Sequence, residues 1–276
     1  MDTDSLKEYF VKTLGWGWGH QQQIVFSFLC SAAVESKGGV VLDAGAGHQR
    51  YKPFFCDSLY VAQEHPEAGK VNKKLLEYDI LSDVRRIPLR DESVDLILST
   101  STLEHLEYPG EFFAESFRVL KPGGSLYVNV PFVYPEHEIP FDFQRPTRYG
   151  LRRYYQHSGF DRVSVKPTSS SVYTAQGNFL QAVNEAGGSG RQSLRSRAIA
   201  GITRRIARLA CWAAMRVFDR EPDEGTSFPV GWVAQGYKPG EKGAAVTCGT
   251  VRQFLENNAE CGPNEYLEDG RILSRR

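Results

Sequence analysis

Asp43, Gly45 and Gly47 follow closely after the apolar run Val40–Leu42. Glycine allows a tight backbone turn and lets a ligand lie against main-chain N–H groups, as at the carboxyl end of a parallel strand. The spacing therefore predicts a buried strand that ends in a ligand-binding turn, with Asp43 beside the ligand. The alternative is a strand-to-helix turn that binds nothing.

A dinucleotide matches this turn poorly. The G-x-G-x-x-G pattern of pyrophosphate sites needs glycine or alanine at its sixth position, where this sequence has Arg50, and Pro53 follows soon after. This mismatch argues against NAD and FAD, so an NAD-dependent oxidoreductase ranks third among our interpretations.

Two more carboxylates follow further apolar runs. Glu64 comes after the run Leu59–Ala62, where a carboxylate can accept hydrogen bonds from ribose hydroxyls, and Asp83 lies in the segment 79–89. Carboxylates at the ends of successive strands suit a ligand with hydroxyls, an amine and a positive centre, and they repel phosphates. S-adenosylmethionine (SAM) has these groups. Taken alone, Glu64 could be a surface acid and Asp83 a turn cap.

The polar segment 131–149 is expected to leave a strand end above the cofactor. Its candidate acceptor-binding residues are Asp142, Arg145 and Tyr149. His137 is the candidate catalytic base, because imidazole titrates near neutral pH, and His105 is the second candidate. The same side chains could instead hold the loop in place. His137-Glu138 does not continue to H-E-x-x-H, and we expect no metal site.

The elements that must position these residues alternate along the chain. Short apolar runs predict seven strands, at 40–42, 59–62, 75–78, 94–98, 126–130, 163–165 and 230–237. Helical spacing and glycine stops predict helices at 21–36, 111–120 and 147–158. This alternation predicts an α/β fold, a three-layer sandwich with a seven-stranded, mostly parallel sheet.

The segment 191–220 carries eight arginines and one acid. A helix would gather on one face the residues Ile199, Ile202, Ile206, Leu209, Ala213 and Val217. We favour a lid that packs this face on the sheet domain, and the alternative is a helix adsorbed to anionic lipid. Neither an aromatic stacking platform nor an RNA-binding motif accompanies the arginines, so no nucleic-acid partner is expected.

Overall composition gives few clues to partners. Acidic and basic side chains number 33 each, so net charge does not direct the protein to an acidic surface. The five cysteines are scattered without a C-x-x-C pair, as is typical of reduced thiols in the cytosol. The N-terminus lacks the positive region of a signal peptide. We expect a cytoplasmic protein. The segment 191–220 is its candidate for peripheral contact with the inner face of the membrane. The sequence does not determine the oligomeric state.

Five motifs occur in order with the spacing of strands. They are Asp43-Ala-Gly-Ala-Gly47, Asp83-x-x-x-Ile-Pro88, Ser93-Val-Asp95-Leu-Ile-Leu, Leu103-Glu104-His105-Leu106 and Arg118-Val-Leu-Lys-Pro-Gly-Gly124. In this order they resemble the SAM-dependent methyltransferases of the Rossmann-like class, type 11 methyltransferase domain. The resemblance spans roughly residues 38–165, and 228–238 resembles the last strand of the family.

The resemblance implies a role for each matching position. Asp43, Gly45 and Gly47 would hold the methionine end of SAM, Glu64 the ribose, Asp83 with Val84 the adenine, and Ser99 with Thr100 the path beside the sulfonium. The sequence departs from the family at three places. It has His48 where a glycine is common, Gln63 where an apolar residue usually precedes the acid, and Ser101 where many members have glutamate.

These interpretations together predict an enzyme that transfers a methyl group from SAM to an oxygen or nitrogen of a small polar acceptor, such as a sugar or glycan precursor. The alternative is a SAM-binding or degenerate methyltransferase fold that serves as a membrane-associated scaffold without turnover. We expect residues 1–238 to form the domain, 191–220 a basic helical insertion, and 239–276 a C-terminal tail or small appended element.

Overall fold

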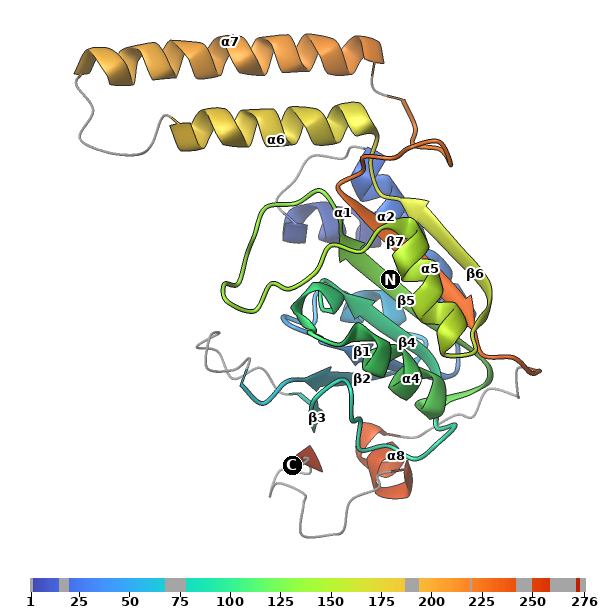
Figure 1. Cartoon of the computed structure of the whole chain (residues 1–276). Coiled ribbons are helices and arrows are strands. Elements are labelled where there is room, and N and C mark those ends of the chain that lie inside the picture. The colour runs from blue at the N-terminus through green and yellow to red at the C-terminus, as the bar shows by residue number, and fades with distance from the viewer. Residues whose placement is uncertain are drawn as a thin grey trace.

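The structure is a computed structural model, and it describes residues 2–14, 20–67, 78–186, 194–218, 220–241, 250–258 and 272–273. One mixed sheet runs through the domain, with its strands in the order β6-β7-β5-β4-β1-β2-β3-β8 (Figure 1). Their bounds are β1 Val40–Ala44, β2 Leu59–Glu64, β3 Ile80–Leu81, β4 Val94–Thr100, β5 Leu120–Pro131, β6 Asp161–Pro167, β7 Gly231–Tyr237 and β8 Ile272–Leu273.

The sheet is parallel apart from β7, which runs antiparallel to both β5 and β6. The predicted mostly parallel α/β sheet is confirmed, and the short β8 adds an eighth strand. The third strand is formed by Ile80–Leu81. The predicted strand at 75–78 falls mostly outside the described residues.

Helices cover both faces of this sheet (Figure 1). Their bounds are α1 Thr3–Leu14, α2 His20–Glu35, α4 Pro109–Val119, α5 Arg148–His157, α6 Ser171–Ala186, α7 Leu194–Phe218 and α8 Val251–Asn258, with short 3₁₀ turns η1 Lys52–Phe55 and η2 Leu103–His105. Side chains alternate along a strand, so Val40 and Leu42 pack on one face and Val41 on the other. Two apolar cores result, one against each helical layer.

The first core lies against α4, α5 and α8, and the second against α1 and α2. Phe112 and Tyr155 are buried in the first core, together with Phe254 and Leu255 of α8. Part of the segment predicted as a tail or appended element therefore contributes to the core. Phe10 and Leu29 belong to the second core.

The helices α6 and α7 form a hairpin between β6 and β7 that extends away from the sheet (Figure 1). The prediction that α7 packs its apolar face on the sheet domain as a lid is wrong. The exposed fractions of Ile202, Ile206 and Leu209 are 57%, 62% and 67%, whereas Ala207 is buried. The helix α7 packs along α6, and the hairpin extends away from the sheet, so the sheet domain does not cover these bulky residues. Among the described residues, no helix combines the length and hydropathy needed to span a bilayer.

Candidate active site

The turn after β1 is tightly packed at its first glycine and open at its second. Gly45 has a φ of +77°, and a Cβ added there would lie 2.2 Å from Thr102 Oγ1. Its N–H donates to the carbonyl of Gln63 over 3.1 Å. Gly47 has a φ of +50°, and none of the described atoms lies within 4 Å of a Cβ added there. Only glycine suits position 45, and the space beside Gly47 is open to a ligand.

Asp43, at the end of β1, is a buried carboxyl with one free oxygen. Its Oδ2 accepts a short hydrogen bond from the Tyr60 hydroxyl of β2, and its side chain is 1% exposed. Its Oδ1 accepts no hydrogen bond from any residue that the structure describes. Burial raises the pKa of Asp43 to about 7, and the nearby Glu64 charge adds to the rise, although the Tyr60 hydrogen bond opposes it. A buried acceptor without a partner is a fitting place for a donor of a bound ligand.

Glu64 and Asp83 are both held by the protein itself. The Glu64 carboxylate accepts from the Gly47 N–H over 2.7 Å and from the His65 N–H over 2.8 Å. Asp83 accepts a 2.7 Å hydrogen bond from the Arg85 guanidinium. Burial alone would raise the pKa of Asp83, but the hydrogen bonds from Arg85 outweigh it and lower the pKa. The structure thus brings Asp43 and Glu64 to the glycine turn, while the Asp83 carboxylate is paired with Arg85.

The other predicted cofactor residues lie at nearby strand ends. Ser99 is buried in β4, and its hydroxyl has no hydrogen-bond partner among the described residues. Thr100 ends β4 and is half-buried, and Val84 is buried after β3. The sequence reasoning missed Tyr60 and Thr102, which hold Asp43 and the turn. Since both are common residues in strands and turns, the pattern alone carries no signal for them.

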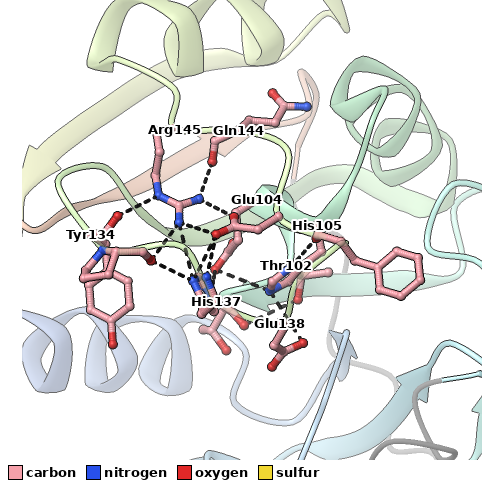
Figure 2. Close-up of polar contacts among 12 residues, drawn as sticks. Thr102, Glu104, His105, Tyr134, His137, Glu138, Gln144 and Arg145 are labelled. Atoms are coloured by element: carbon pink, nitrogen blue, oxygen red, sulfur yellow. Dashed lines mark hydrogen bonds and ion pairs between the residues drawn. The ribbon is translucent and has the colours of Figure 1, made fainter. Parts of the chain in front are cut away.

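A second cluster of polar residues lies just beyond β4 (Figure 2). Glu104 and His105 come from η2, and His137 comes from the loop 132–147 after β5. The Nε2 atoms of His137 and His105 lie 3.6 Å and 3.9 Å from Glu104 Oε1. The Glu104 carboxylate raises the pKa of His137 above its ordinary value. The structure therefore brings both predicted catalytic histidines together, around a buried glutamate that the sequence reasoning used only as part of a motif.

Two predicted acceptor-binding residues fix this loop. Arg145 holds Asp142 through both carboxylate oxygens, with a 2.6 Å contact to Oδ2. The hydrogen bonds from Arg145 keep the pKa of Asp142 well below its usual range. Arg145 also donates to the Pro135 carbonyl, and the Phe143 N–H donates to the Glu104 carbonyl. Tyr149 lies on α5 and is 69% exposed. The pair Asp142–Arg145 thus stabilises the shape of the loop, and its binding role stays a proposal.

Comparison with known proteins gives a family for the central part of the chain. Residues 42–128 match the family model described as "Methyltransferase domain" (Methyltransf_11), which confirms the resemblance predicted from the motifs. A Mycolicibacterium smegmatis protein named "Probable S-adenosylmethionine-dependent methyltransferase" is 30% identical over 119 residues, which is 41% of this chain and 45% of that protein. The malonyl-[acyl-carrier protein] O-methyltransferase of Marinomonas sp. is 27% identical over 113 residues, which is 37% of this chain and 42% of that protein.

Each match spans less than half the length of these curated relatives. Among solved structures, the [4+2]-cyclase SpnF superposes with a TM-score of 0.52 at 15% identity, covering 82% of this chain and 84% of that one. A likeness at this identity establishes the fold, and chemistry has to be argued from the site.

Proposed function

We propose that this protein transfers a methyl group from SAM to an oxygen or nitrogen of a small polar acceptor. One observation carries the proposal: the carboxyl end of β1 joins a glycine turn, open at Gly47, to the buried and partly unpartnered Asp43. This arrangement lies within the residues that match the methyltransferase domain. The SAM-dependent relative supports SAM as the cofactor.

The residues present fit SAM. The Asp43 carboxylate, once ionised, would attract the cationic methionine end of SAM, and Gly45 with Gly47 would let it approach the main chain. Glu64 would hold the ribose hydroxyls after giving up its hydrogen bond to Gly47. Asp83 and Val84 would border the adenine, and Ser99 with Thr100 the sulfonium.

SAM supplies an electrophilic methyl group: the acceptor atom bonds to the methyl carbon as the carbon–sulfur bond breaks, and the sulfur keeps the electron pair. The protein must align the acceptor, exclude water and take up the acceptor's proton. The loop 132–147 is well placed for this, because hydrogen bonds at Glu104 tie it to η2, next to the glycine turn. His137 and His105 are the proposed catalytic residues, and Asp142, Arg145 and Tyr149 the proposed acceptor-binding residues. Such a polar loop would suit a sugar hydroxyl as the acceptor.

The test is transfer of label. Methyl-labelled SAM is incubated with a small-molecule cell extract, with and without the protein, and the products are separated. We expect a compound that gains label only with the intact protein and not with the Asp43→Ala variant. Asp57→Asn, a change at an exposed acid, is the matched control and should transfer label normally. Binding of SAM without any labelled product would favour the non-catalytic scaffold instead.

We further propose that the α6–α7 hairpin contacts an anionic membrane surface. The segment 194–218 has no acidic residue. The exposed apolar residues of α7 include Trp212, Val217 and Phe218, in addition to Ile202, Ile206 and Leu209. The same helix exposes three arginines, Arg205, Arg208 and Arg216. Exposed bulky apolar groups next to arginines are typical of interfacial helices.

Vesicle flotation tests this contact. The protein should float with vesicles that contain anionic lipid and not with vesicles of phosphatidylcholine alone. Each basic residue near the surface contributes about 1 kcal/mol, so the triple change Arg205→Gln, Arg208→Gln and Arg216→Gln should weaken binding on the order of 100-fold. The control carries Arg86→Gln, Arg90→Gln and Arg153→Gln, which change exposed arginines of the sheet domain. Equal flotation of both triple variants would contradict the proposal.

A further inference from the structure

Both histidines of the cluster at η2 are oriented by backbone carbonyls. His105 Nδ1 lies 2.7 Å from the Phe141 carbonyl oxygen, and His137 Nδ1 lies 3.2 Å from the Pro135 carbonyl oxygen. A carbonyl oxygen only accepts, so in the neutral form of each ring a hydrogen on Nδ1 satisfies this contact and leaves the lone pair on Nε2, although His137 Nδ1 also lies 3.4 Å from Arg145 Nη2. Both Nε2 atoms face the same oxygen of Glu104. Outer hydrogen bonds of this kind are those that orient histidine ligands of metal ions.

Glu104 is the third member, and it lacks the partners that a buried carboxylate requires. Its side chain is fully buried, and neither carboxylate oxygen accepts a hydrogen bond from any residue in the described ranges. A buried, unpaired carboxylate is costly unless a cation neutralises it. The Arg145 guanidinium is already paired with both oxygens of Asp142. Glu138 adds another negative charge, with an oxygen 3.8 Å from His105 Nε2. The cluster therefore favours a cation.

The spacing of the three ligand atoms fits a metal ion. One atom each from Glu104, His105 and His137 lies within 4.8 Å of the other two. Ligands about 2.1 Å from a tetrahedral ion lie about 3.4 Å apart. The two nitrogen–oxygen separations, 3.6 Å and 3.9 Å, need only small side-chain movements to reach this value. Two imidazoles and a carboxylate suit divalent transition metals better than magnesium or calcium, which prefer oxygen ligands.

We propose that Glu104, His105 and His137 bind one divalent transition-metal ion, such as Zn²⁺ or Mn²⁺. The ion would keep open positions, because three protein ligands do not fill its coordination shell. The sequence alone predicted no metal, since His105 and His137 lie in separate segments and Glu104 was not considered a ligand. The fold brings the three together at the carboxyl end of the sheet.

The location gives this site a use that rests on the proposed methyl transfer. Thr102 contacts the carbonyl of Ala44 and precedes η2, so the metal ligands begin directly beside the glycine turn. A hydroxyl of the acceptor bound to the ion would release its proton to water at lower pH than a free hydroxyl. The resulting oxygen anion would then attack the methyl carbon. On this proposal the two histidines act as ligands, and the acceptor is an alcohol or phenol.

Titration calorimetry on the whole chain tests the site. After treatment with a chelator and its removal, the protein is titrated with Zn²⁺, Mn²⁺ and Mg²⁺ separately, without SAM. We expect one equivalent of Zn²⁺ or Mn²⁺ to bind more tightly than Mg²⁺. Glu104→Gln, His105→Asn and His137→Asn should each weaken binding by at least tenfold. His157→Asn changes an exposed histidine at the end of α5 and should bind as the unchanged protein does.

A second measurement keeps the test valid if the buried Glu104→Gln variant does not fold. Co²⁺ added to the unchanged protein should give a visible absorption band of nitrogen-coordinated cobalt, and Zn²⁺ should displace it. The absence of stoichiometric binding and of this band would overturn the proposal and would leave His137 as a simple counter-ion of Glu104. SAM affinity, measured on the same metal-free protein, reports separately on the proposed function.

Discussion

Replacing Gly45 with alanine is expected to impair both stability and SAM binding. The added Cβ would lie 2.2 Å from Thr102 Oγ1 and 2.7 Å from its Cγ2, in a backbone conformation with φ of +77°. The left-handed conformation alone costs about 1–2 kcal/mol for a residue with a Cβ. The turn must also move to relieve the clash, and misplacement by about 1 Å can reduce activity about 100-fold. Calorimetry with SAM and thermal unfolding measure the two effects.

Two further variants separate the causes. Gly47→Ala has space for its Cβ but keeps a φ of +50°, so it should lose only about 1–2 kcal/mol of stability and weaken SAM binding mainly by occupying space beside the ligand. Gly45→Ala combined with Thr102→Ala removes the two closest atoms and leaves the Cβ contact at 3.0 Å, so it should recover part of the stability. A Gly45→Ala protein with unchanged unfolding temperature and SAM affinity would show that the turn is not packed as described.

SAM affinity should rise with pH around neutrality. The pKa of Asp43 is raised to about 7, so Asp43 is mainly protonated at pH 6 and mainly ionised at pH 8. The ionised form attracts the cationic ends of SAM, and affinity should therefore increase about tenfold between these two pH values. Calorimetry in matched buffers measures it. Asp43→Asn should bind weakly at both pH values, and Asp57→Asn should keep the full pH dependence. Equal affinity of the unchanged protein at pH 6 and pH 8 would contradict the role of Asp43.

The same shift has a consequence for the protein without ligand. The pKa of Asp43 is higher in the folded chain than its ordinary value of 3.8, so the unfolded chain releases this proton first as pH rises. The contribution of protonated Asp43 to the free energy of unfolding is complete below about pH 4 and is lost as pH rises towards about 7. Asp43→Asn should therefore stabilise the ligand-free protein at pH 8, as measured by denaturant unfolding, while it weakens SAM binding.

The elements around the cofactor residues could be predicted because their signals are local. The apolar runs before Asp43 and through Val94–Leu98 lie within β1 and β4, and glycines mark the chain reversals. The strand predicted at 126–130 lies within β5, which starts earlier, at Leu120, and has an irregularity between Leu120 and Ser125. Periodicity shows where an element lies and is less informative about its ends.

The parts that depend on distant contacts could not be predicted. The spacing of apolar residues in α7 indicated which of them share a face, but not whether another element covers it. Glu104 looked like an ordinary motif residue, because its burial and the approach of His137 depend on how the loop after β5 folds back. Likewise, the hydrogen bond from Tyr60 to Asp43 follows from strand neighbours rather than from sequence spacing.

The place of β7 also affects how the chain is made. This strand lies between β5 and β6, yet the ribosome produces it only after the whole helical hairpin. Until then, β5 presents an unpaired apolar edge, and such edges readily join other chains. A nascent chain that ends before Gly231 should therefore aggregate more readily than one that also includes β7.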